Sequence, residues 1–124
     1  TMIDQNMTKM NCWFEEKIAL CGKRNLELNE DGRTDEAIFE KVKANIYDVF
    51  RTVLSVAGKT GNGDADAVKS FFTQRAEQIP AAWATALEKA KEHNDTVRMR
   101  TEQIKLDTVH EIREEFAKIW EGAE

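Results

Sequence analysis

The closest match to a metal-binding motif in this sequence lies near its end, in residues 110–114 (HEIRE). Metalloproteases bind zinc with two histidines four residues apart on a helix, but here Glu114 replaces the second histidine. Asp107 and His110 resemble one of the two carboxylate–histidine pairs that hold the metal ions in a di-metal helical bundle. The sequence contains no second pair of this kind. We therefore predict no metal site and interpret Asp107 and His110 as a solvent-facing pair on a helix.

A glycine-containing segment, Gly58-Lys59-Thr60, matches the end of a phosphate-binding P-loop. The complete motif needs another glycine five residues before Gly58, where this sequence has Val53, and a helix directly after the loop. We therefore predict a flexible loop over residues 58–63 and no nucleotide site there.

Two acidic pairs, Glu15-Glu16 and Glu114-Glu115, point to the one enzymatic alternative. They resemble the pairs with which all-α nucleotide pyrophosphohydrolases hold magnesium. Adjacent residues on a helix diverge by about 100°, however, so neither pair converges on an ion by itself. No histidine stands near either cysteine to activate a nucleophile. We expect a non-enzymatic protein without a cofactor, and the alternative is a small metal- or nucleotide-dependent hydrolase on an all-α bundle.

The composition favours helices and narrows the class of partner. Hydrophobic residues make up 41% of the 124 residues and charged residues 33%, with one proline and six glycines. A net charge of -5 with both signs interspersed disfavours nucleic acid as a partner. No apolar stretch is long enough to span a membrane, and no secretory leader pattern is visible. Cys12 and Cys21 would point to opposite faces of one helix, so we expect two free thiols and a cytoplasmic location.

Hydrophobic periodicity and turn residues predict where the helices begin and end. We expect an all-α fold in which residues 1–124 form one domain, an antiparallel bundle of three to four helices with a long C-terminal helix. A helix break is expected at Ile79, because the residue before a proline avoids the α region. The expected helices cover about residues 4–29, 34–57, 65–78 and 80–120.

The last of these helices determines the function that we expect. No glycine or further proline follows Pro80 until Gly122, and a continuous helix over 80–120 would span about 60 Å, compared with about 37 Å for the first two helices. Its apolar and small residues follow a heptad spacing typical of a coiled coil. We therefore expect an interaction or scaffold protein that forms a homodimer through this helix. The expected interface comprises Asn94, Val97, Thr101, Ile104, Thr108, Ile112, Phe116, Ile119 and Trp120.

Overall fold

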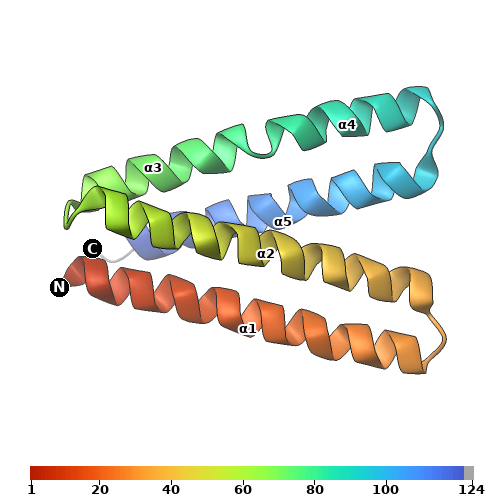
Figure 1. The fold of residues 1–124 in the computed structure, drawn as a ribbon, viewed down its shortest axis with the longest axis horizontal. Helices are drawn as coiled ribbons and strands as arrows, with labels where there is room; N and C mark the ends of the chain where they lie inside the picture. Colours follow the sequence, from red (N-terminus) through yellow and green to blue (C-terminus); the bar gives the residue numbers. More distant parts are fainter. Residues whose placement is uncertain (122–124) are drawn as a thin grey trace.

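The computed structural model describes residues 1–121, which form five helices. The helices are α1 (Met2–Glu30), α2 (Thr34–Gly61), α3 (Ala65–Gln78), α4 (Ala81–Glu92) and α5 (Thr96–Glu121). Figure 1 shows that α3 and α4 follow each other along nearly one line, so the helices form four rods of alternating direction. Residues 1–121 contain no strand. The predicted all-α antiparallel bundle is therefore confirmed.

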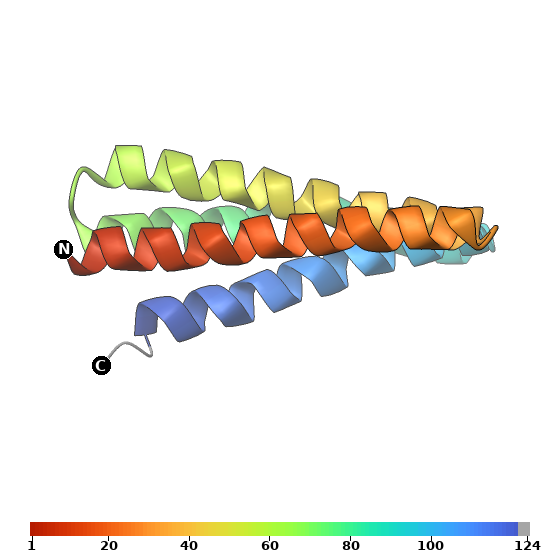
Figure 2. The ribbon, with the colours of Figure 1, turned by 90° about the horizontal axis from the view of Figure 1, so that it is seen from below.

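The rods surround a core of aromatic and aliphatic side chains. Contacts are most extensive between α1 and α2, and α2 also packs on α3 and on α5. Contacts between α1 and α5 are few, and Figure 2 shows α5 lying obliquely to α1. No helix within residues 1–121 is both long and apolar enough to cross a membrane. The largest completely buried side chains include Met10, Phe14, Phe50, Leu54, Phe72 and Ile112.

The turn between α1 and α2 closes with the hydrogen bonds of a Schellman motif. Gly32 has a φ of 74°, in the left-handed region that glycine adopts at low cost. The amide of Arg33 donates to the carbonyl of Leu28 (2.8 Å), and the amide of Gly32 donates to that of Asn29 (3.1 Å). This turn joins α1 and α2 as neighbouring antiparallel helices.

The prediction of one continuous helix over residues 80–120 was wrong, because the chain reverses at residues 93–95 between α4 and α5. Asn94 has a φ of 53° and takes the place that glycine occupies in the first turn. The amide of Asp95 donates to the carbonyl of Ala90 (2.9 Å), and its carboxylate accepts from the amide of Arg98 (3.1 Å), which caps α5. Asparagine adopts this conformation more readily than most residues, so the helix ends without a glycine. Residues 1–121 contain no helix of about 60 Å, and α5 (26 residues) is similar in length to α1 (29 residues) and α2 (28 residues).

The predicted flexible loop over residues 58–63 was also wrong, because α2 continues to Gly61. Only Asn62, Gly63 and Asp64 connect α2 to α3. Gly61 is buried where the two helices meet, and a Cβ atom added to it would lie 2.5 Å from Cγ2 of Val68 and 3.2 Å from the Val68 amide nitrogen. The glycine therefore permits a close helix–helix contact instead of providing flexibility.

We predict that Gly61→Ala lowers the free energy of unfolding by about 1–2 kcal/mol, because the added methyl group overpacks this contact. Gly22→Ala is the matched control, since Gly22 lies within α1 with nothing within 4 Å of its added Cβ. That control should stabilise the protein by about 0.5–1 kcal/mol through helix propensity. Urea denaturation followed by circular dichroism measures both. Equal stabilisation by the two substitutions would contradict the close contact.

The rod formed by α3 and α4 bends at Ile79 and Pro80 without a change to extended backbone. Ile79 has φ −61° and ψ −45°, so the prediction that it avoids the α region was wrong. Pro80 has no N–H, and the carbonyl of Ala76, four residues earlier, therefore loses its usual helical donor. The guanidinium of Arg113 on α5 donates a hydrogen bond to this carbonyl. Arg113 thus replaces the missing hydrogen-bond donor of Ala76 and connects the bend to α5.

Candidate functional site

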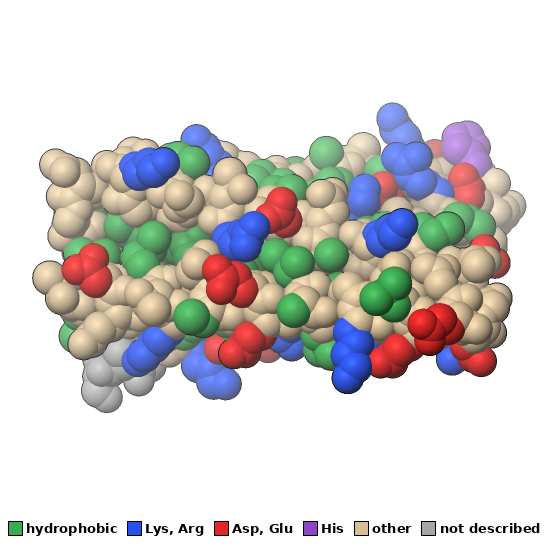
Figure 3. Space-filling model, turned by 60° about the horizontal axis from the view of Figure 1, so that its bottom comes forward, with side chains coloured by type: hydrophobic (Ala, Val, Ile, Leu, Met, Phe, Trp, Pro, Cys, Tyr) green, Lys and Arg blue, Asp and Glu red, His purple; other side chains and the backbone are tan. Residues whose placement is uncertain are grey.

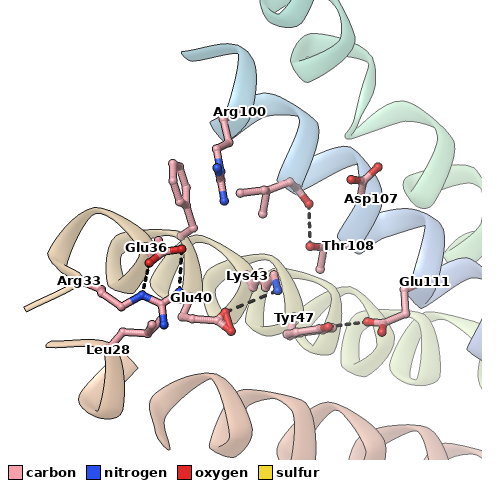
Figure 4. A pocket seen from close by; sticks show the side chains of 12 residues that line it. Leu28, Arg33, Glu36, Glu40, Lys43, Tyr47, Arg100, Asp107, Thr108 and Glu111 are labelled. Carbon is pink, nitrogen blue, oxygen red and sulfur yellow. Dashed lines mark hydrogen bonds and ion pairs between the residues drawn. The ribbon is translucent and has the colours of Figure 1, made fainter. Parts of the chain in front are cut away.

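A cleft of about 470 Å³ opens between the first half of α2 and α5, with Leu28 near the end of α1 at its edge. Figure 4 shows α2 crossing the base of the cleft, with α5 on one side and α1 on the other. Contacts between α1 and α5 are few, whereas α2 packs on both of these helices. Its charged lining residues are Arg33, Lys43, Arg100, Glu36, Glu40, Asp107 and Glu111.

The inner end of the cleft holds a polar network that joins three helices. The hydroxyl of Tyr47 on α2 donates a hydrogen bond to Glu111 on α5, and Nζ of Lys17 on α1 lies 3.4 Å from the other oxygen of Glu111. Trp13 packs edge-on against Tyr47, with ring centroids 5.7 Å apart. Burial first, and then the hydrogen bond to the Glu111 carboxylate, raise the pKa of Tyr47 well above its ordinary value.

We predict that Tyr47 stays un-ionised in the folded protein above pH 10. Its folded pKa is raised, so the unfolded chain loses this proton first, and the stability that Tyr47 contributes is lost as the pH rises above 10. Tyr47 is the only tyrosine, so ultraviolet absorbance of tyrosinate reports on it alone. Native protein should show no tyrosinate signal until it unfolds, whereas protein in denaturant should titrate near pH 10.

The variant Tyr47→Phe provides the control for this titration. It should lack the tyrosinate signal and should lose less stability than the unchanged protein between about pH 10 and 11. A native titration near pH 10 in the unchanged protein would contradict the buried hydrogen bond.

Midway along the cleft, Glu40 is buried but paired with two cations. Its side chain lies 3.5 Å from Nζ of Lys43 and 3.8 Å from the guanidinium of Arg24 on α1. Cys21 is a buried free thiol near this group, and burial, followed by the charge of Glu40, raises its pKa. Glu40 therefore links α1 to α2. The raised pKa keeps the Cys21 thiol protonated, as is typical of an unreactive thiol in a protein core.

The outer end of the cleft is formed by arginines. Arg33 forms a double hydrogen bond with Glu36, and this bond lowers the pKa of Glu36. Arg100 on α5 places its guanidinium 4.8 Å from the centre of the Phe39 ring. A planar guanidinium can lie against an aromatic ring and still donate from its edge to a carboxylate.

A second buried carboxylate lies outside the cleft, on α5. Glu102 is 1% exposed, and its Oε1 atom lies 3.1 Å from Nε of Arg98 and 3.3 Å from Nζ of Lys105. Within residues 1–121 its Oε2 atom has no hydrogen-bond partner. In the sequence, Glu102 is one of many charged residues in this helix and nothing distinguishes it from an exposed one, so its burial was not predicted.

The residues that the sequence linked to metal or phosphate chemistry do not come together in one site. His110 and Glu114 are exposed, with Nε2 of His110 2.7 Å from Oε1 of Glu114, while Asp107 accepts a hydrogen bond from Gln103 at 2.9 Å. Gly58 lies within α2 against Met7. In the described residues 1–121, no group of three histidine, cysteine, aspartate or glutamate side chains is placed to hold a metal ion.

The predicted interface residues do not share one surface. Asn94 lies in the turn before α5, and Val97 is 69% exposed. Thr101, Ile104, Ile119 and Trp120 are half-buried. The core of the chain itself contains Thr108, Ile112 and Phe116.

The side chains that α5 presents to the cleft instead follow a neighbouring line. We call Arg100, Ile104, Asp107 and Glu111 the cleft row, because all four line the cleft at spacings of four, three and four residues. This spacing is visible in the sequence, but it does not show which helix the row faces. Comparisons with models of protein families, with curated proteins and with solved structures find no match to this chain.

Proposed function

We propose that this protein is a non-enzymatic helical interaction module that self-associates through the surface around the cleft. The observation that carries this proposal is the cleft row on α5. Spacings of three and four residues place these side chains on one face of α5, which is the arrangement with which one helix meets another. Arg100 and Glu111 contact α2 through Phe39 and Tyr47. Asp107 is exposed at the opening of the cleft, where no rod within residues 1–121 covers it.

Apolar side chains at the same end of the bundle support an interaction surface. Leu26 near the end of α1, Ile38 near the start of α2 and Val97 at the start of α5 are 64%, 57% and 69% exposed. Figure 1 shows that both the α1–α2 turn and the α4–α5 turn lie at this end. Apolar groups beside paired charges match the mixed composition of protein–protein interfaces.

The charges of the molecule favour a protein as the partner. Both signs are interspersed on the face shown in Figure 3. Within the cleft, Glu36, Glu40 and Glu111 already pair with cations on the chain itself. These carboxylates hold the walls of the cleft in place, so no specific observation favours the alternative of a metal- or nucleotide-dependent hydrolase.

Sedimentation equilibrium tests the proposed self-association. The exposed apolar side chains are few, so we expect a weak dimer whose average mass rises from 14.2 kDa toward twice that value as the protein concentration increases from about 10 μM to about 1 mM. A mass that stays at 14.2 kDa over this range would contradict the proposal.

A further inference from the structure

We infer that the cleft is occupied by α5 of a second copy of this chain, lying antiparallel to the first α5 about a two-fold axis between residues 103 and 104. This inference rests on the proposed self-association and specifies its geometry. A two-fold contact requires a surface that is complementary to itself. The cleft row meets that requirement, as its charges show.

Arg100 and Asp107 are equally distant from the proposed axis and carry opposite charges. In the antiparallel arrangement, Arg100 of each copy therefore faces Asp107 of the other, and the same ion pair forms twice. Both side chains are exposed and line the cleft. The guanidinium of Arg100 lies over the Phe39 ring, and Oδ1 of Asp107 accepts a hydrogen bond from Gln103. Both groups are thus oriented by the chain before a partner arrives.

The apolar residue of the cleft row lies beside the proposed axis. Ile104 would face its own equivalent there, with Phe39 and Leu28 of the cleft as further apolar surface. An apolar centre flanked by ion pairs is a common arrangement in protein interfaces. The cleft contains three cations and four carboxylates, so two clefts brought together repel each other only weakly.

The dimensions of the cleft also fit a helix that lies along it. Its α2 lining extends from Glu36 to Tyr47, which corresponds to roughly 16 Å of helix, and the cleft row extends over roughly 16 Å of α5. A cleft of about 470 Å³ accepts side chains but not a whole helix. The second α5 would therefore rest on the opening of the cleft and insert its row of side chains.

Charge reversal at the two partners of the ion pair tests this geometry. Arg100→Asp and Asp107→Arg each place like charges opposite each other at both symmetric positions. Each single substitution should raise the dimer Kd about tenfold or more. The double variant R100D/D107R restores opposite charges, so its Kd should return to within about threefold of the unchanged protein. Lys118→Glu is the matched control on α5, since Lys118 is exposed and does not line the cleft, and it should leave the Kd unchanged.

Sedimentation equilibrium of these variants distinguishes the possible results, with circular dichroism to verify that each remains helical. Weakening by both single substitutions and recovery in the double variant would support the antiparallel contact. A dimer that withstands both single substitutions, or that fails to recover in the double variant, would overturn this geometry but leave self-association intact. An unchanged protein that stays monomeric at about 1 mM would overturn both the geometry and the proposed function.

Discussion

Replacing Phe116 with alanine should lower the free energy of unfolding by about 3–5 kcal/mol. Phe116 is 4% exposed and stacks between two other aromatic rings. Its ring centroid lies 4.1 Å from that of Phe72 on α3 and 4.5 Å from that of Trp120. Truncation removes both stacking contacts and leaves a cavity where α3 meets α5.

Urea denaturation of Phe116→Ala measures this loss, with Val97→Ala as the control on the same helix. Val97 is 69% exposed, so its truncation should change the free energy of unfolding by less than about 0.5 kcal/mol. The sequence predicted both residues as parts of one interface, whereas the structure places one in the core and the other at the surface. A Phe116→Ala variant of unchanged stability would contradict the core position.

Arg113→Ala should lower the free energy of unfolding by about 1.5–3 kcal/mol, because it leaves the buried carbonyl of Ala76 without its donor. The size of this loss depends on Pro80, whose missing N–H makes the side-chain donor necessary. In a Pro80→Ala background, the backbone amide of residue 80 is available to bond to Ala76. There the effect of Arg113→Ala should fall below about 1 kcal/mol.

A double-mutant cycle over these two positions, measured by urea denaturation, determines the coupling directly. Lys118→Ala is the control for removing a long cationic side chain from α5, and it should cost about 0.5 kcal/mol or less in either background. Equal losses from Arg113→Ala with and without Pro80 would show that Arg113 does not compensate for the proline.

The ends of several helices were predictable because local chemistry determines them. The third helix covers the predicted residues 65–78, since Asp64 accepts hydrogen bonds from the amides of Asp66 and Ala67 at its start. The turn after α1 was predictable for a similar reason, because Gly32 adopts a positive φ without strain.

The break between α4 and α5 was missed because the prediction treated only glycine and proline as helix breakers. Asn94 adopts a positive φ without being glycine, and Asp95 caps the next helix. The pair asparagine–aspartate was the available signal. Gly58 and Gly61 led to the opposite error, because a glycine required for close packing has the same sequence signal as a glycine in a flexible loop.

The candidate site was less predictable than the fold. Its lining comes from the α1–α2 turn, α2 and α5, which are distant in the sequence. Tyr47 and Glu111, for example, are separated by 64 residues, and only the packing of α2 on α5 brings them into contact. Spacing within one helix identifies a face but does not identify what covers that face.

By itself, the sequence determined that this protein is a bundle of amphipathic helices, because apolar periodicity and helix caps act over a few residues. Tertiary structure alone decided where the chain reverses between α4 and α5, which face of α5 joins the core, and where a cleft remains. Those outcomes depend on contacts between helices. Phe116 lies in the core because Phe72 of α3 reaches it, and Arg100 borders the cleft because α5 lies beside α2, where Phe39 meets its guanidinium.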